Sequence, residues 1–317
     1  MNERVRSILA QQTTKTNKIQ QLLLWGLTRR EVADLVTNGN YGFVHNVYKK
    51  MLENGTLDLS ESSRCRNSIL SQTDYTFHHR FGVEIEAYNC PRSRLAEELE
   101  NAGIRVAVER YNHDMRPHWK LTTDSSLSGN DTFELVSPIL VGENGLGELE
   151  TVCWVLETCA VKVNDSCGLH IHMDAADFNM NTWKNLALNY KRLEPVIDSF
   201  MPRSRRDNNR YCKSLRSISE TDIMNATTLG ELQEVFSNNR YYKLNLQAYP
   251  AHQTVEFRQH SGTINFMKIE KWIRFVSGMI IHAQTTGLPR NISLERLPFL
   301  SEKEKLFYKL RTKKLSR

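Results

Sequence analysis

The chain has 317 residues, enough for two domains, and its 42 Lys/Arg and 36 Asp/Glu give a formal net charge of +6. It contains no run of about 18 apolar residues, and its charged N-terminus lacks the apolar core of a signal peptide, which argues against a membrane partner and predicts a cytoplasmic location. The six cysteines have no C-x-x-C spacing, so neither a zinc ribbon nor a disulfide framework is expected.

The positive charge lies at the two ends of the chain. Residues 1–52 and residues 301–317 each carry a net charge of +5, so residues 53–300 carry −4. Basic ends are typical of proteins that bind polyanions, although a charge run alone is more often a solvated surface. Charge therefore says little about the central part of the chain.

Residues 1–52 are predicted to form a small all-α domain. Apolar residues recur at helical spacing in "NKIQQLLLWGL" (17–27). Thr28 and Glu31 then have the spacing of a capping box, which starts a second short helix. The turn "TNGN" (37–40) separates this helix from a third, "YGFVHNVYKKM" (41–51).

Two short helices joined by a tight turn resemble a helix-turn-helix DNA-binding domain, in which residues 41–51 would be the recognition helix. A small helical bundle used for docking or dimerisation is the alternative interpretation. By this resemblance, the side chains that contact DNA bases or phosphates are Arg29, Arg30, Asn40, Tyr41, His45, Asn46 and Lys49.

Residues 53–78 are rich in Ser and Asn and are predicted to be a linker. From residue 79 to about 290, short strands alternate with turns and helices, which predicts an α+β domain with a largely antiparallel sheet and helices on one face. No internal repeat is recognised, and residues 291–317 are expected to form a basic C-terminal tail. The expected strands are 81–88, 104–111, 119–124, 132–140, 168–174, 243–249 and 254–260, and the expected helices are 92–102, 146–161, 181–200, 228–238 and 267–285.

Several predicted strands carry polar residues on a single face. In "FGVEIEAY" (81–88), Glu84 and Glu86 alternate with apolar residues, so both carboxylates point to the same side of the strand. Polar residues interrupt the apolar ones in the same way in three other strands, "TFELVSPIL", "GLHIHMD" and "TVEFRQH". The residues expected together on this face are Glu84, Glu86, Glu134, His170, His172, Glu256 and Arg258.

An acid-rich set of this kind favours hard divalent cations. Carboxylate oxygens suit Mg²⁺ or Mn²⁺, which keep substrate phosphates as further ligands, whereas sites made only of histidine favour zinc. The chain has no P-loop and no G-x-G-x-x-G motif, so ATP would have to be held through metal and cations. Taken singly, each polar pair is more often the solvent face of a strand.

Six segments in this order resemble the amidoligase family, which has the glutamine synthetase and glutamate-cysteine ligase fold: "FGVEIEAY", "WKLTTDSSL", "FELVSPIL", "CGLHIHMD", "NRYCK" and "YYKLNLQAYPAHQTVEFRQHSGT". The resemblance covers roughly residues 79–290 and excludes the N-terminal helices. It implies an ADP-forming ligase in which ATP phosphorylates a carboxylate and an amine then attacks the acyl phosphate. An amidoligase domain behind a helical unit is similar to bacteriophage or other mobile-element proteins; for a phage-encoded protein the location would be the cytoplasm of the host cell.

The resemblance also implies roles for individual residues. Two or more Mg²⁺ (or Mn²⁺) ions would be held by Glu84, Glu86, Glu134, His170 and Glu256. His172 would lie near the nucleotide phosphates, Arg258 would stabilise phosphoryl charge, Arg210 or Lys213 would clamp phosphate or the acid, Asp124 and Ser125 would position the amine, and Asn245 would line the pocket. Active sites of this fold are often completed across subunits, so a homo-oligomer is also implied. The acid and amine would be an amino acid, a peptide or a modified macromolecule.

Two other interpretations remain open. The first is a DNA-binding regulator whose C-terminal domain senses a nucleotide or an amino acid without turnover. The second is a metal-dependent hydrolase built on His170 and His172, which predicts a bound transition metal and no dependence on nucleotide.

Overall fold

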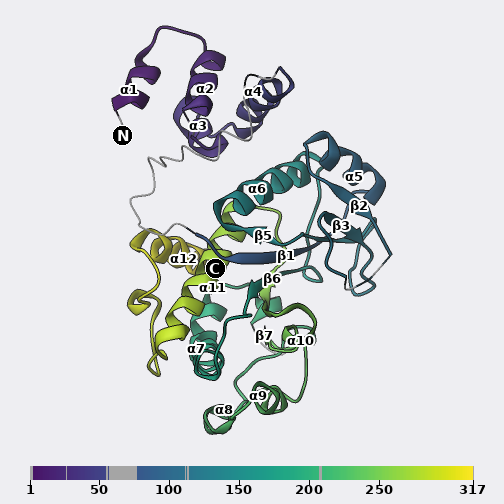
Figure 1. Cartoon of the computed structure of the whole chain (residues 1–317), viewed down its shortest axis with the longest axis vertical. Coiled ribbons are helices and arrows are strands. Elements are labelled where there is room, and N and C mark those ends of the chain that lie inside the picture. The colour runs from purple at the N-terminus through teal and green to yellow at the C-terminus, as the bar shows by residue number, and fades with distance from the viewer. Residues whose placement is uncertain are drawn as a thin grey trace. The chain divides into compact units, whose positions relative to one another are not determined.

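The computed structural model describes residues 3–25, 27–54, 56, 77–110, 112, 114–206 and 209–316. The chain divides into two compact units, Met1–Thr76 and Phe77–Arg317 (Figure 1). The expected linker, residues 53–78, lies almost entirely outside the described residues.

The N-terminal unit is a bundle of short helices. Thr28 caps its helix as predicted, because Thr28 Oγ1 accepts a hydrogen bond from Glu31 N and Glu31 Oε2 accepts one from Thr28 N. In the turn before the last helix, Asn38 and Gly39 have φ of 54° and 84°, the left-handed region that Asn and Gly tolerate best. The helices are α1 (Glu3–Ala10), α2 (Lys15–Leu24), α3 (Arg29–Val36) and α4 (Tyr41–Glu53).

Two residues that were expected to contact DNA lie instead in the core of this unit. Tyr41 is 8% exposed and His45 is 3% exposed. His45 Nδ1 lies 3.1 Å from Arg29 Nη1, and the Arg29 guanidinium lies 4.8 Å from the centre of the Tyr48 ring. Burial, assisted by the charge of Arg29, lowers the pKa of His45 to about 4, so the ring is neutral and packs as an apolar group. The prediction that these two side chains face outward is wrong.

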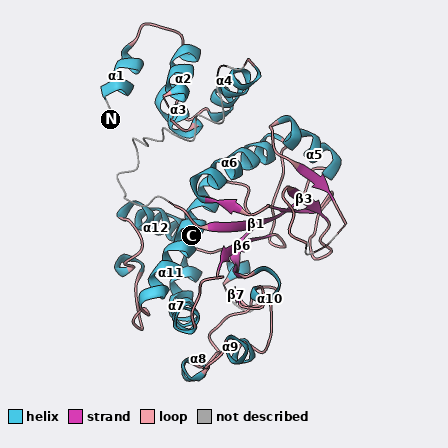
Figure 2. Ribbon diagram, viewed as in Figure 1, coloured by secondary structure: helices cyan, strands magenta, loops and turns pink. Residues whose placement is uncertain are grey.

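The second unit is an α+β domain built on one sheet. The strand order is β2-β3-β4-β1-β6-β8-β7, with β5 also paired to β1. β2 and β3 pair in parallel and the other neighbours are antiparallel, so the predicted fold class is confirmed (Figure 2). The strands are β1 (Arg80–Ala87), β2 (Val106–Val108), β3 (Trp119–Thr122), β4 (Phe133–Val136), β5 (Leu140–Val141), β6 (Gly168–Asp174), β7 (Leu244–Asn245) and β8 (Thr254–Ser261).

Four expected strands are shorter than predicted: 104–111 keeps only β2, 119–124 keeps only β3, and two more are shortened near prolines. The segment 132–140 divides into β4 and β5 at Ser137 and Pro138; Pro138 has no N–H to donate, and Ser137 Oγ accepts a hydrogen bond of 2.8 Å from Val83 N. The segment 243–249 keeps only β7, because Pro250 starts a short helix, α10. The last two differences arise at prolines.

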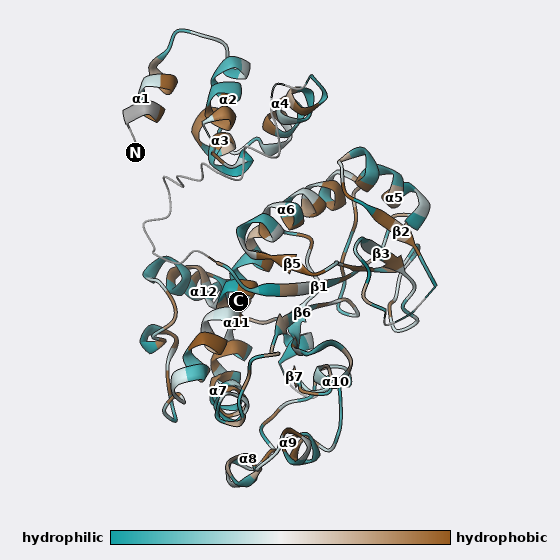
Figure 3. Ribbon diagram, viewed as in Figure 1, coloured by the Kyte–Doolittle hydropathy of each residue, from teal (hydrophilic) through white to brown (hydrophobic). Residues whose placement is uncertain are grey.

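Helices pack on the apolar face of the sheet. Val83, Ile85, Leu169, Ile171 and Phe257 are fully or almost fully buried there, and they form one core with side chains of α5, α6, α7 and α11 (Figure 3). In the described ranges, no helix is both long and apolar enough to cross a membrane. The helices are α5 (Arg92–Asn101), α6 (Gly142–Thr158), α7 (Met180–Ser199), η1 (Arg203–Arg205), α8 (Glu220–Asn225), α9 (Leu229–Val235), α10 (Tyr249–His252), α11 (Phe266–Thr285), η2 (Leu294–Arg296) and α12 (Glu302–Leu315).

The C-terminal segment 291–317 belongs to this unit and is not a separate tail. In α12, the buried Tyr308 donates a hydrogen bond of 2.8 Å to the carbonyl of Lys271, and Arg311 Nε donates one of 2.7 Å to the carbonyl of Phe200. The Tyr308 ring also lies 4.4 Å from the ring of Phe200, centre to centre. The basic charge that predicted a tail is carried by the outer side of a packed helix.

A buried network of charged and polar side chains joins α7 to Lys243, just before β7, and to Gln259 of β8. Lys243 is fully buried, and its Nζ donates hydrogen bonds to Glu194 Oε1 at 2.9 Å and to Asp198 Oδ1 at 2.7 Å. Gln259 Nε2 donates to the same Asp198 oxygen at 2.6 Å and accepts, through Oε1, a bond of 2.7 Å from Tyr190. A satisfied network of this kind fixes the arrangement of the elements that it joins.

Replacing the buried lysine should destabilise the fold strongly. In Lys243→Met, Glu194 and Asp198 lose their shared cation, so we expect the free energy of unfolding to fall by about 3–5 kcal/mol. Urea denaturation of the full chain measures this loss. Lys213→Met, at a partly exposed lysine, is the matched control and should cost less than about 1 kcal/mol. Equal losses in the two variants would contradict the structural role of the network.

Candidate active site

The polar residues predicted on one face of the sheet meet across the strands. Glu84 of β1 is opposite His170 of β6, and His172 of β6 is opposite Glu256 of β8. On the other side of β1, Glu86 is opposite Glu134 of β4. Cross-strand partners project to the same face, so these side chains converge on the face opposite the apolar core.

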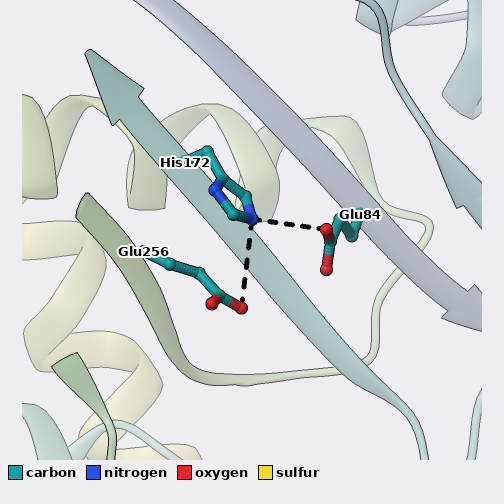
Figure 4. A group of neighbouring side chains, drawn as sticks. All are labelled: Glu84, His172 and Glu256. Carbon is teal, nitrogen blue, oxygen red and sulfur yellow. Dashed lines mark ion pairs between the residues drawn. The ribbon is translucent and has the colours of Figure 1, made fainter. Parts of the chain in front are cut away.

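The converging groups are within reach of a shared cation. His170 Nδ1 lies 2.9 Å from Glu84 Oε2, and His170 Nε2 lies 3.6 Å from Glu86 Oε1. His172 Nε2 lies 3.3 Å from Glu84 Oε1 and 4.0 Å from Glu256 Oε1 (Figure 4). Three overlapping groups have ligand atoms within 4.8 Å of one another: Glu84 with His172 and Glu256, Glu84 with Glu134 and His170, and Glu86 with Asp124 and Glu134.

His172 shows that this donor set fits a divalent cation. Its Nε2 is buried and is among the described side-chain atoms that have no hydrogen-bond partner, although two carboxylates face it. Its Nδ1 lies 3.0 Å from Thr254 Oγ1, which holds the ring in this orientation. A buried imidazole nitrogen turned toward carboxylates, with its other nitrogen held by a neighbour, is the arrangement of a metal ligand.

Glu256 is held by two neighbours. Asn245 Nδ2 donates a hydrogen bond to Glu256 Oε2, and Arg258 Nη1 pairs with Glu256 Oε1. Arg258 Nε also donates to the carbonyl of Tyr211 at 3.2 Å. Burial disfavours the charged guanidinium, but Glu256 outweighs it and raises the pKa of Arg258. The carboxylate is therefore fixed beside a permanent cation.

These groups lie in a cleft of about 1170 Å³. Most of the residues predicted for substrate and nucleotide line it, namely Asp124, Ser125, His172, Arg210, Asn245 and Arg258. Lys213 does not line this cleft; it lines a smaller hollow of about 190 Å³ with Ser214 and Ser217. Asp124 was expected near the amine. One of its carboxylate oxygens lies within 4.8 Å of carboxylate oxygens of Glu86 and Glu134.

Residues 78–280, more than half of the chain, match the model of a family described as "Putative amidoligase enzyme". The chain belongs to this family. A solved structure described as a "novel glutamine synthase homolog" is similar to this amidoligase chain at 13% identity and a TM-score of 0.35, over 76% of this chain and 62% of that one. The amidoligase chain thus spans less than two thirds of the length of that structure, and no curated protein matches it.

The amidoligase unit contains a short repeat that the sequence analysis missed. "NNRYCK" (208–213) and "NNRYYK" (238–243) differ at one position, so the interpretation that the chain has no internal repeat is wrong at this scale. In the structure, Lys213 and Tyr242 form a parallel bridge that places the two copies next to each other. In each copy an Asn side chain accepts a hydrogen bond from the backbone of the Tyr two residues on, at 2.7 Å in one and 2.8 Å in the other.

The repeat forms one wall of the cleft. Arg210 lies over the ring of Tyr211 at 5.5 Å, Arg240 lies over the ring of Tyr241 at 5.1 Å, and the two rings are 5.8 Å apart, centre to centre. We call these four side chains the Arg–Tyr wall. All four line the cleft. A comparison of the sequence with itself would have revealed Arg240 and Tyr241, which motif analysis overlooked.

Two buried cations of the cleft gave no sequence signal. Arg205 and Lys120 are 3% and 4% exposed. Lys120 Nζ donates a hydrogen bond of 2.7 Å to the carbonyl of Asp114. Arg205 lies in the basic stretch "RSRR", which is typical of a solvated surface, so only the tertiary structure shows that one of its members turns inward.

When no metal ion is bound, the negative charges of the glutamates in the amidoligase cleft repel one another. Burial, followed by the charges of Glu84 and Glu86, raises the pKa of Glu134 well above its usual range. Burial also disfavours the charged form of Glu84, but the imidazoles of His170 and His172 outweigh it and hold the pKa of Glu84 well below its usual range. The charged form of Glu134 therefore costs stability unless a cation joins the group.

Removing this charge should stabilise the metal-free protein. We expect Glu134→Gln to raise the melting temperature in EDTA by about 2–4 °C, which corresponds to about 1 kcal/mol for a domain of this size, and to abolish stabilisation by Mg²⁺. Thermal unfolding with EDTA and with Mg²⁺ measures both effects. Glu97→Gln, at an exposed glutamate of α5, is the matched control and should change neither. A lower melting temperature for Glu134→Gln in EDTA would contradict this electrostatic account.

Proposed function

We propose that this chain is an ATP-dependent carboxylate–amine ligase that forms an amide through an acyl phosphate and releases ADP. One observation carries the proposal: four glutamates and two histidines converge in one cleft as overlapping groups of cation ligands. The family match to an amidoligase supports the same reaction class.

The chemistry of amide formation calls for such a cleft. A carboxylate is a poor electrophile at neutral pH, and phosphorylation activates it by providing a leaving group. ATP must then be held with its charge neutralised, and acid-rich sites bind the Mg²⁺ that accompanies phosphates. The cleft of about 1170 Å³ exceeds the usual range of about 300–1,000 Å³ for small-molecule sites, so it has room for ATP and a second substrate.

In this proposal the four glutamates and both histidines would hold Mg²⁺ or Mn²⁺, with His172 on the side of the nucleotide phosphates. Bound metal would neutralise charge on the phosphoryl group that moves. Arg258, fixed by Glu256, binds the phosphates, and His172 and Asn245 complete the nucleotide side of the cleft. Asp124 and Ser125 position the amine, since a carboxylate attracts the ammonium form and can accept its proton.

The Arg–Tyr wall is proposed to hold the outer part of the nucleotide. Its arginines can bind phosphate oxygens in a bidentate manner, and its tyrosine rings offer flat apolar faces to a base. Lys213 has no role in this arrangement because it lines the separate hollow.

The proposed use of ATP implies a reaction inside the cell. We propose a cytoplasmic ligase, in the host cell if the gene belongs to a bacteriophage, that acts as a homo-oligomer on an amino acid, a peptide or a modified macromolecule. A regulator that binds nucleotide without turnover is the alternative that the experiment below separates.

Thermal unfolding with Mg²⁺ and ATP tests the proposal. A ligand at a hundredfold its dissociation constant stabilises by about 2.7 kcal/mol, a shift of roughly 5–10 °C for this domain, and ADP should form with a suitable acid and amine. Glu256→Gln should lose both the shift and the ADP, whereas Glu97→Gln should keep both. A shift without ADP in any acid and amine mixture would favour the regulator, and no shift in the unmodified protein would refute the ligase.

We further propose that the N-terminal unit binds DNA through α4. Asn40, Asn46 and Lys49 are exposed on or beside this helix, and Arg30 is exposed on α3, whereas Tyr41 and His45 belong to the core. Exposed amide and basic side chains on a helix that follows a tight turn are suited to base and phosphate contacts.

Deleting residues 1–52 should abolish salt-sensitive DNA binding and leave the Mg²⁺-ATP shift intact. Fluorescence anisotropy with a labelled duplex between about 50 and 200 mM salt measures the affinity. Lys49→Ala should lower the slope of log affinity against log salt by about one, and Lys15→Ala, at an exposed lysine of α2, should leave it unchanged. Unchanged DNA affinity in the truncated protein would refute this proposal.

A further inference from the structure

Arg205 is a cation of the cleft whose charge has no visible counterpart. Its side chain is 3% exposed, and it lines the cleft from η1. Among the described residues, no carboxylate lies within the 4.0 Å ion-pair distance of its guanidinium, and its buried Nε has no hydrogen-bond partner. A contact with the thiol of Cys212 cannot balance a full positive charge. A buried and unpaired cation is strongly destabilising, which indicates that its anion is a ligand.

The other arginines of the cleft differ from Arg205. Arg258 is already paired with Glu256, and the rest are exposed to solvent, namely Arg80, Arg116, Arg210 and Arg240. Solvent screens the charges of exposed groups and little is lost if they stay without a ligand, whereas the cost at Arg205 is offset only when an anion binds.

The guanidinium of Arg205 lies near Glu86 and His170 of the proposed metal site. A methyl group placed on Gly168 would lie 2.9 Å from His170 Nε2 and 3.2 Å from both Glu86 Oε2 and Arg205 Nη2. These three groups therefore crowd around Gly168, and any larger residue there would displace one of them. An anion bound to the guanidinium from the cleft would lie close to Glu86 and His170.

The position of Arg205 is fixed by buried groups behind it. Gln259 Nε2 donates a hydrogen bond of 3.3 Å to the carbonyl of Arg205, and Lys243 Nζ donates one to the carbonyl of Arg206. Both donors are fully buried members of the ion network under the sheet. Arg205 is thus held in place before any ligand arrives, which lowers the entropic cost of binding.

We propose that Arg205 binds the reacting carboxylate of the acid substrate, an assignment that rests on the proposed ligase function. The planar carboxylate matches an edge of the planar guanidinium, which binds both oxygens at once. The exposed Arg–Tyr wall offers room for a triphosphate, which leaves the enclosed Arg205 for the smaller carboxylate. The acid would then present its carboxylate beside Glu86 and His170, where phosphorylation is proposed to occur.

Acetate is the carboxylate probe and inorganic phosphate is the competing probe, each titrated with Mg²⁺ and followed by thermal unfolding of the full chain. In Arg205→Met, we expect the melting temperature without anion to equal or exceed that of the unmodified protein, because an unpaired charge is removed. The dissociation constant for acetate should rise about tenfold or more. Arg203→Met, at an exposed residue of the same short helix, should change neither quantity.

The outcomes separate this assignment from other roles. Acetate stabilisation that persists in Arg205→Met, or that is absent from the unmodified protein, would overturn it. A loss confined to phosphate would assign Arg205 to the phosphoryl group instead. If Arg205→Met does not fold, Arg205→Lys keeps the charge without the two-pronged edge and should still weaken acetate binding about tenfold; unchanged binding there would overturn the proposal. A Mg²⁺-ATP shift retained in Arg205→Met would show that the nucleotide site and the carboxylate site are distinct, and its absence from the unmodified protein would refute the ligase alone.

Discussion

The alternation of side chains along an antiparallel strand is the constraint on which this cleft depends. Ile85, Leu169 and Phe257 pack on one face of the sheet, and their burial fixes the register of β1, β6 and β8. Glu84 and His170 take the opposite face as a direct result. A slip of one residue would send carboxylates into the core, so the same packing that stabilises the sheet also enforces the convergence of the site.

Bringing these charged side chains together costs free energy, and the domain offsets part of that cost with ion pairs and hydrogen bonds. Arg258 partly compensates Glu256, and the imidazole of His170 compensates Glu84. Behind the sheet, Lys243 joins two carboxylates in a fully satisfied network. Glu134 and Arg205 differ: neighbouring carboxylates repel Glu134, and Arg205 has no counter-ion among the residues that the structure describes. Charges left uncompensated inside a stable fold are typical of sites that await ligands.

The strands and their polar faces could be predicted because both depend on a local, two-residue period. Glu84 and Glu86 show this in a stretch of eight residues. Predictions failed where a side chain's environment comes from distant segments: His45 is buried against α3, and Tyr308 packs on Phe200 more than a hundred residues away. Arg205 carries no local signal at all. The "NNRY" repeat was readable in the sequence, but its proximity to Arg258 depends on tertiary pairing.

Four arginines of the cleft differ widely in hydration. Arg210 and Arg240 are exposed, Arg258 has a side chain that is 13% exposed, and Arg205 is almost completely enclosed. An anion that moves inward would meet cations that water screens less and less. Salt would therefore slow its capture by the exposed arginines, whose charges are screened, while its residence time would be set by the enclosed ones. Entry and retention in this cleft would thus respond to different solution conditions.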